Sequence, residues 1–166
     1  MRTNRLARDL KEAPASFLSL GVLATELAQA LQPQERLAPS QAAEKYRMLH
    51  NPGAYSGPYL NETTPYMAEP LDVLADREKK ACIFVGPAQT GKTDSLILNS
   101  ILYTVVCDPM DTILYQTSQS VAADFSRTRL DRMHRHSPEV GKRVLPGGSA
   151  DTVHAKYYDS GIVVNL

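Results

Sequence analysis

The segment from residue 81 to residue 103 constrains the fold more than any other part of the chain. It begins with five apolar residues, continues with a loop of the form G-x-x-x-x-G-K-[ST], and then shows apolar residues at helical spacing. The loop starts at Gly86 and closes with Gly91, Lys92 and Thr93. A strand before this pattern and a helix after it form the context in which it binds phosphate. The segment therefore predicts a buried central strand over 81–85, a phosphate-binding loop, a helix and an α/β fold.

The chemistry of this loop comes from its backbone and from two side chains. Glycine lets the chain approach a phosphate closely, so backbone N–H groups and the positive end of the following helix can face the anion. We expect Lys92 to reach the β- and γ-phosphate oxygens and the Thr93 hydroxyl to bind Mg²⁺. The predicted nucleotide-binding residues of the loop are Gly86, Pro87, Ala88, Gln89, Thr90, Gly91, Lys92 and Thr93. The alternative is a turn that binds nothing, but such a turn has no need of Lys-Thr at a helix start.

The composition narrows the classes of function. Lys plus Arg and Asp plus Glu are each 18 of 166 residues, so the net charge gives no case for a strongly basic nucleic-acid binder. Cys82 falls in the predicted central strand and Cys107 near the end of the next helix, which is typical of reduced core cysteines in a cytosolic protein. The histidines form no metal-ligand pattern with them. His134 and His136 lie two residues apart, on different helix faces, and we expect both to be exposed.

Residues 16–31 form the most membrane-like stretch of the chain. Polar residues interrupt its apolar run, and it is too short to span a bilayer, so it predicts an amphipathic helix and no membrane contact. Its apolar stripe, formed by Leu20, Leu23, Leu27 and Leu31, suits packing on the same protein or docking of a partner subunit equally well. We expect residues 1–50 to form a helical N-terminal arm and residues 51–166 the front part of the nucleotide-binding domain.

The chain beyond the loop predicts a second strand–helix unit and a hairpin. A strand is expected over 112–116 and a helix over about 121–136, with Val121, Phe125, Leu130 and Met133 facing inward. The opposite side carries Arg127, Arg129, Arg132 and Arg135, which suits either a solvated face or contact with phosphates or DNA. Residues 153–158 and 161–166 resemble two strands of a hairpin.

One element of a nucleotide-hydrolysing site is missing from the pattern. Such a site needs a second apolar strand that ends in Asp, usually followed by Glu, to hold Mg²⁺ and polarise the attacking water. The last apolar run, Ile162 to Val164, leads into Asn165 and Leu166 instead. The sequence therefore predicts an incomplete domain, which binds ATP weakly and hydrolyses it poorly or not at all.

Ordered blocks from about residue 37 onward resemble the large terminase subunit of tailed phages, in the lambda-like GpA branch. The blocks are residues 37–47, 57–59, 65–72, the loop at 86–93 with Asp94, residues 116–138 in part, and residues 154–158 with Gly161. The loop alone would not identify this family, but the ordered set is far more specific. The resemblance implies a helicase-like P-loop NTPase fold, a mostly parallel sheet flanked by helices, of which this chain holds an incomplete part with a helical N-terminal arm.

The resemblance also implies a function. Members of this family are ATP- and Mg²⁺-dependent motors that pump double-stranded DNA into an empty procapsid in the host cytoplasm, and a C-terminal endonuclease cuts the DNA concatemer. They assemble as oligomers with a small terminase subunit and a portal ring, and the helix over 16–31 is then a candidate docking element. Tyr66 is a candidate for stacking on adenine, with a core tyrosine as the equal alternative. Arg129 is a candidate phosphate or DNA contact.

Two departures from the family pattern bear on these expectations. Many large terminases carry an arginine inside the loop, where this chain has Gln89, so an arginine finger must come from elsewhere. The sequence also shows neither the acidic strand nor the nuclease domain of this family. The main alternative hypothesis is therefore a non-hydrolysing module that binds a partner or DNA. An unrelated small P-loop kinase is disfavoured, because a kinase also needs acidic residues and a lid.

Overall fold

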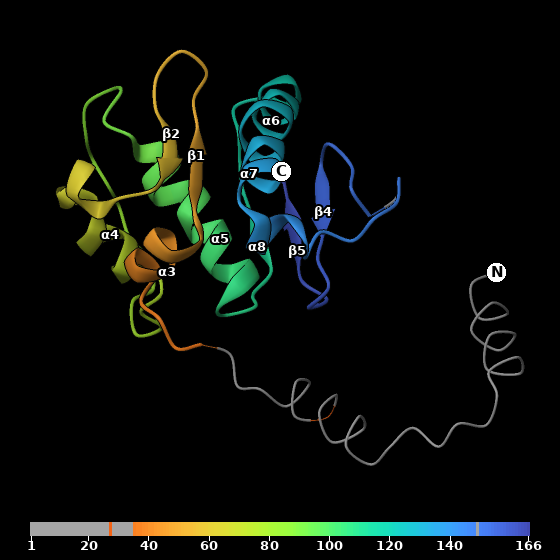
Figure 1. The fold of residues 1–166 in the computed structure, drawn as a ribbon, viewed down its shortest axis with the longest axis horizontal. Helices are drawn as coiled ribbons and strands as arrows, with labels where there is room; N and C mark the ends of the chain where they lie inside the picture. The colour runs from red at the N-terminus through yellow and green to blue at the C-terminus, as the bar shows by residue number, and fades with distance from the viewer. Residues whose placement is uncertain (1–26, 28–34, 149) are drawn as a thin grey trace, which may run out of the picture. The chain divides into compact units, whose positions relative to one another are not determined.

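The computed structural model describes residue 27, residues 35–148 and residues 150–166. Residues Glu35–Leu166 form one compact unit, shown in colour in Figure 1. The helix expected over 16–31 lies outside the described residues, except for Leu27, which is helical and exposed. The division expected near residue 50 stays a prediction. None of the helices in the described part of the chain is long and apolar enough to cross a membrane.

Short helices and strands alternate along the compact unit. The first half contains α3 (Pro39–Tyr46), β1 (Met48–His50), β2 (Ser56–Pro58), the 3₁₀ turns η1 (Asn61–Thr63) and η2 (Pro65–Met67), and α4 (Ala68–Val73). A π-helical segment, η3 (Thr93–Leu98), then leads into α5 (Asn99–Val106) and β3 (Thr112–Ile113). The second half contains α6 (Gln119–Phe125), the π-helical segment η4 (Ser126–Leu130), α7 (Asp131–His136), α8 (Pro138–Gly141), β4 (Ala155–Tyr157) and β5 (Val163–Asn165).

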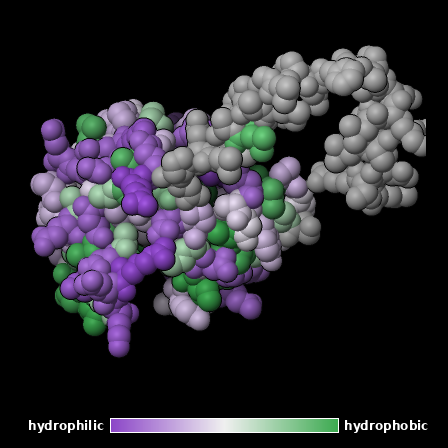
Figure 2. Space-filling model, turned by 90° about the horizontal axis from the view of Figure 1, so that it is seen from below, coloured by the Kyte–Doolittle hydropathy of each residue, from purple (hydrophilic) through white to green (hydrophobic). Residues whose placement is uncertain are grey.

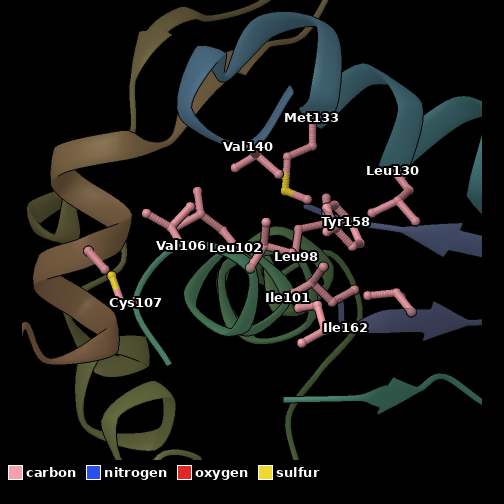
Figure 3. Close-up of a cluster of buried hydrophobic side chains, with 13 residues drawn as sticks. Leu98, Ile101, Leu102, Val106, Cys107, Leu130, Met133, Val140, Tyr158 and Ile162 are labelled. Atoms are coloured by element: carbon pink, nitrogen blue, oxygen red, sulfur yellow. The ribbon is translucent and has the colours of Figure 1, made fainter. Parts of the chain in front are cut away.

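Helix α5 is the centre of the hydrophobic core. The apolar residues predicted for the helix after the loop, Leu98, Ile101, Leu102 and Val105, are all at most 1 % exposed, which confirms that prediction. In Figure 3, Leu98, Ile101 and Leu102 face Leu130 and Met133 of the following helices and Tyr158 and Ile162 near the C-terminal strands. Val140 of α8 and Val164 of β5 complete the same cluster. The core therefore joins α5 to η3, η4, α7, α8 and β5, and to Ala42 of α3.

The strands form two small sheets. Strands β1 and β2 make an antiparallel pair, and β3, β5 and β4 make a three-stranded sheet in that order. Strand β3 runs parallel to β5, while β4 and β5 form the antiparallel hairpin expected near the C-terminus. Only one of these three strand pairs is parallel, so the described sheets are mixed rather than mostly parallel. The result is a mixed α/β unit.

The segment 81–85 differs most from its prediction. It is not a strand, and Ile83 and Val85 are 88 % and 89 % exposed. Cys82, expected in the core, is exposed as well, whereas Cys107 is buried and its burial raises the pKa of the thiol to about 11. A central strand is stabilised by hydrogen-bonded neighbours on both edges. No strand of the described part pairs with residues 81–85, so their apolar side chains stay in solvent.

Exposed apolar side chains also line the nearby edge of β3. Ile113 and Tyr115 are 60 % and 86 % exposed. A groove of about 290 Å³ lies between the two segments, with Cys82 and Phe84 on one side, Thr112 and Leu114 on the other, and η3 and α5 beneath. Figure 2 shows one face of the unit, where hydrophobic side chains in green interrupt a mostly hydrophilic surface.

The helix predicted over about 121–136 forms, with one change in its buried face. Ser118 caps it by accepting a hydrogen bond from the Val121 backbone, and the helix continues through α6, η4 and α7 to His136. Leu130 and Met133 are fully buried, as expected. Val121 is 44 % exposed, contrary to prediction, because it lies in the first helical turn beyond the reach of the core.

His134 is also more enclosed than its position in the sequence suggested. Its Nε2 lies 2.9 Å from the hydroxyl of Tyr158, a fully buried residue. Burial, followed by the nearby positive charge of Lys156, lowers the pKa of His134 to about 4. Lys156 is itself held by Asp131 and Asp151, at 2.8 and 2.5 Å. His134 is therefore a neutral part of the core boundary, and the expectation that it is solvent-exposed is wrong.

A pair of matched substitutions tests the exposure of residues 81–85. Ile83→Ser should change the free energy of unfolding by less than about 0.5 kcal/mol, because Ile83 is already in solvent. Ile101→Ser makes the same chemical change at a residue that is 1 % exposed, and should cost about 3 kcal/mol or more. Urea denaturation of both variants gives the comparison. A large loss for Ile83→Ser would mean that the predicted buried strand forms after all.

The buried His134 predicts a specific dependence of stability on pH. The unfolded chain binds a proton at this residue near pH 6.5 and the folded chain only near pH 4, so folding is opposed as the pH falls between these values. The contribution is on the order of 2–3 kcal/mol. His134→Gln, which keeps a hydrogen-bonding group toward Tyr158, should flatten the loss of stability between pH 6.5 and 4. Equal slopes for the two proteins would contradict the burial of a neutral imidazole.

Candidate functional site

The loop over 86–93 adopts a wrapped conformation that its sequence explains. Gln89 and Gly91 both have positive φ values, 58° and 79°, in the left-handed region where glycine is favoured. The Thr90 hydroxyl donates to the carbonyl of Pro87 at 3.1 Å and closes the turn. The loop therefore curves back on itself immediately before the helix begins.

The side chain of Lys92 folds over this curved loop. Its ammonium donates to the carbonyl oxygens of Gly86, at 3.3 Å, and of Pro87, and it lies 3.3 Å from the Thr90 hydroxyl. All three contacts are to neutral oxygens. No acidic side chain of residues 35–148 and 150–166 forms an ion pair with Lys92. The loop thus holds a positive charge that no carboxylate of the described residues balances.

The helix that follows fixes the C-terminal end of the loop. Thr93 is the first residue of η3 and is partly buried. The Ser95 backbone donates to the carbonyl of Gly91 at 2.8 Å, which ties the helix start to the loop. Leu98 and the residues of α5 continue from there into the core. The position of Thr93 is therefore set by a helix that is anchored at its far end by hydrophobic burial.

Tyr66 lies beside the loop, at the surface. Tyr66 belongs to the 3₁₀ turn η2 and is 54 % exposed. Its hydroxyl donates to the carbonyl of Thr90 at 3.2 Å. This exposure rules out the alternative of a core tyrosine. Tyr66 thus presents an accessible aromatic face next to the loop.

Tyr59 and Thr64, which the sequence analysis did not single out, contact Ser95 at the start of the helix. The Tyr59 hydroxyl donates to the hydroxyl of Ser95 at 3.1 Å, and Thr64 lies 3.4 Å from the same oxygen. Tyr59 is 4 % and Ser95 is 1 % exposed. Because these partners are more than 30 residues apart in the chain, no local pattern in the sequence could have paired them.

A second missed contact is an ion pair between Arg47 and Asp94. The Arg47 side chain is 4 % exposed, and its Nη2 lies 3.0 Å from Asp94 Oδ1. Burial lowers the pKa of Arg47, and the charge of Asp94 opposes that shift. The one available signal was the acidic residue directly after Thr93, which lies in the first turn of the helix.

Arg129, the predicted phosphate or DNA contact, reaches the same carboxylate. Its Nη1 lies 3.8 Å from Asp94 Oδ2, and its side chain is 45 % exposed. The structure therefore brings Arg129 near the helix that carries Lys92 and Thr93. Arg47 and Arg129 share the carboxylate of Asp94, and Lys92, two residues earlier, has no acidic partner among the described residues, so the local charge is positive and favours an anionic ligand.

The comparisons with known proteins identify a family. The family model of the phage terminase large subunit gpA, ATPase domain, matches residues 53–166, which include the whole loop, Tyr66, Asp94 and Arg129. No curated protein and no solved structure gives a significant match. The matched region covers more than half of the chain. The chain therefore belongs to the family of the phage terminase large subunit gpA, in the region of its ATPase domain.

Proposed function

We propose that the loop over 86–93 binds the phosphates of ATP. The observation that supports this most is Lys92, a cation that contacts only neutral oxygens within a curved, glycine-bounded loop. An incoming phosphate would exchange these contacts with neutral carbonyl oxygens for contacts with an anion, in which the Lys92 ammonium and its acceptor carry opposite charges. The backbone N–H groups from Ala88 to Gly91 would surround the same phosphate.

The neighbouring residues suit the remaining parts of a nucleotide. The Thr93 hydroxyl, at the helix start, would bind Mg²⁺ together with phosphate oxygens and water. Among the described residues, no group of three or more His, Cys, Asp or Glu side chains is arranged to hold a metal ion, so the nucleotide itself would supply much of the coordination. The exposed ring of Tyr66 would stack on adenine, next to the loop carbonyl that its hydroxyl contacts.

Membership of the family implies an ATPase role in a packaging motor. We propose that ATP bound at this loop drives the translocation of double-stranded DNA into a procapsid, in an oligomer assembled with a small terminase subunit and a portal in the host cytoplasm. In this proposal residues 1–50 are a helical arm and residues 51–166 the ATPase part. The endonuclease that the resemblance implies would belong to the parent protein outside this region.

A second candidate function is binding of DNA or a partner without hydrolysis. The arginines of η4 and α7 support it, because Arg127, Arg129 and Arg135 are all exposed. Such a surface would contact the phosphate backbone and bind less tightly as the salt concentration rises. This function does not depend on Lys92, so DNA binding that survives Lys92→Ala unchanged, in a chain that binds no nucleotide, would favour it.

The substitution Lys92→Ala tests the proposed nucleotide site. It removes the charge that would meet the phosphates, so the affinity for Mg·ATP should fall by about 10- to 100-fold. Calorimetry with Mg·ATP, together with a phosphate-release assay for turnover, would measure the effect. The exposed Lys79→Ala is the matched control and should bind as the wild type does.

The possible results separate the two candidate functions. Binding that is lost in Lys92→Ala and kept in Lys79→Ala would support the nucleotide site. Equal binding in all three proteins would contradict it, because the loop charge would then play no part. Absence of Mg·ATP binding in the wild type would reject ATP binding by this chain and leave the arginine surface as the functional candidate.

A further inference from the structure

Arg47 is the most deeply buried charged side chain near the candidate site. It is 4 % exposed, it lies where α3 ends, and its guanidinium has two partners, Asp94 Oδ1 at 3.0 Å and the Met48 carbonyl at 3.2 Å. A buried cation is costly unless it is paired, and removal of its partner leaves an uncompensated charge. The fold therefore holds Asp94 firmly against Arg47.

Asp94 lies in the helical turn that carries the proposed ligands of the nucleotide. It directly follows Lys92 and Thr93, and its neighbour Ser95 is held by the Tyr59 hydroxyl. Tyr59 is tied to Arg47, because its backbone N–H donates to the Arg47 carbonyl at 3.0 Å. Arg47 and Tyr59, at the base of the β1–β2 hairpin, thus hold two consecutive residues of the turn, Asp94 and Ser95.

The backbone of this turn is also unusual. Residues Thr93–Leu98 are π-helical, with the Asn99 N–H bonded to the Asp94 carbonyl. The other π-helical segment of the described chain, η4, carries Arg129, which contacts Asp94 Oδ2 at 3.8 Å. Short π-helical segments inside helices are frequent at functional sites. Asp94 therefore belongs to one π-helical segment, contacts an arginine of the other, and pairs with the buried Arg47.

We propose that Arg47 is a positioning residue for the nucleotide site, acting through Asp94. Burial keeps its guanidinium from touching a ligand, so its effect is to hold the turn that presents Lys92 and Thr93 to the phosphates. This inference rests on the proposed function of the loop. A small displacement of a binding group is enough to weaken a site strongly, since catalytic and binding geometry tolerates little error.

Two substitutions of Arg47 separate positioning from overall stability. Arg47→Met keeps the length of the side chain and suits burial, but cannot hold Asp94. We expect it to lose about tenfold or more in Mg·ATP affinity, with a thermal unfolding midpoint near that of the wild type. Arg47→Lys restores one charged contact to Asp94 and should recover part of the affinity. Arg77→Met, which removes an exposed arginine paired with Asp108 at 2.8 Å, is the control and should change neither property.

Hydrogen exchange gives a readout that needs no nucleotide. In Arg47→Met the backbone amides of residues 92–95 should exchange faster than in the wild type, while those of residues 101–105 in the core should not change. Full Mg·ATP affinity in Arg47→Met, or faster exchange spread equally through residues 101–105, would overturn the proposal. If the wild type binds no Mg·ATP, the proposed function of the loop fails, and unchanged exchange at residues 92–95 would then overturn the positioning role separately.

Discussion

Burial of one helix face is the interaction on which the rest of the structure depends. Leu98, Ile101 and Leu102 are almost completely buried, and each such side chain contributes about 1.5–3 kcal/mol relative to an exposed one. Their partners come from the later helices and from the C-terminal strands, so the same helix organises most of the compact unit. Since this helix is continuous with η3, the core also fixes where Thr93 lies.

The two ends of the helix that runs from η3 through α5 differ in their charge. The core end is apolar, while the loop end combines Lys92, Arg47 and Arg129 with the single carboxylate of Asp94. Several ion pairs elsewhere in the described part, such as Arg77 with Asp108, are exposed and contribute little to stability, whereas those of Lys156 involve a side chain that is 4 % exposed. The positively charged Lys92 and Arg129 thus lie within the region that the ATPase-domain family model matches, and Arg47 lies just before it.

Features that arise from local sequence were predictable. The helix after the loop and the hairpin near the C-terminus each follow from periodicity or turn residues over a few positions, and the structure has both. The glycine and lysine pattern likewise located the loop. The ordered blocks of the sequence led to the correct family, which needed more information than the loop alone.

Features that depend on distant partners were not predictable. The apolar run over 81–85 has the composition of a central strand, but pairing decides whether it becomes one, and residues 81–85 have no paired neighbour in the described chain. His134 is enclosed because Tyr158, 24 residues later, packs against it. Arg47 and Asp94 lie 47 residues apart, so their contact is a property of the fold and not of either segment.

The π-helical turn at Thr93–Leu98 has a consequence for how such chains should be compared. A bond from Asn99 back to Asp94 spans one residue more than an α-helical bond, so the turn contains one extra residue. Each residue of an α-helix advances the side chains by about 100° around its axis. A relative with an ordinary α-helix here would therefore need a one-residue gap between the loop and the core positions of α5. An ungapped alignment anchored on the loop would assign Leu98, Ile101 and Leu102 to the wrong face of that relative's helix.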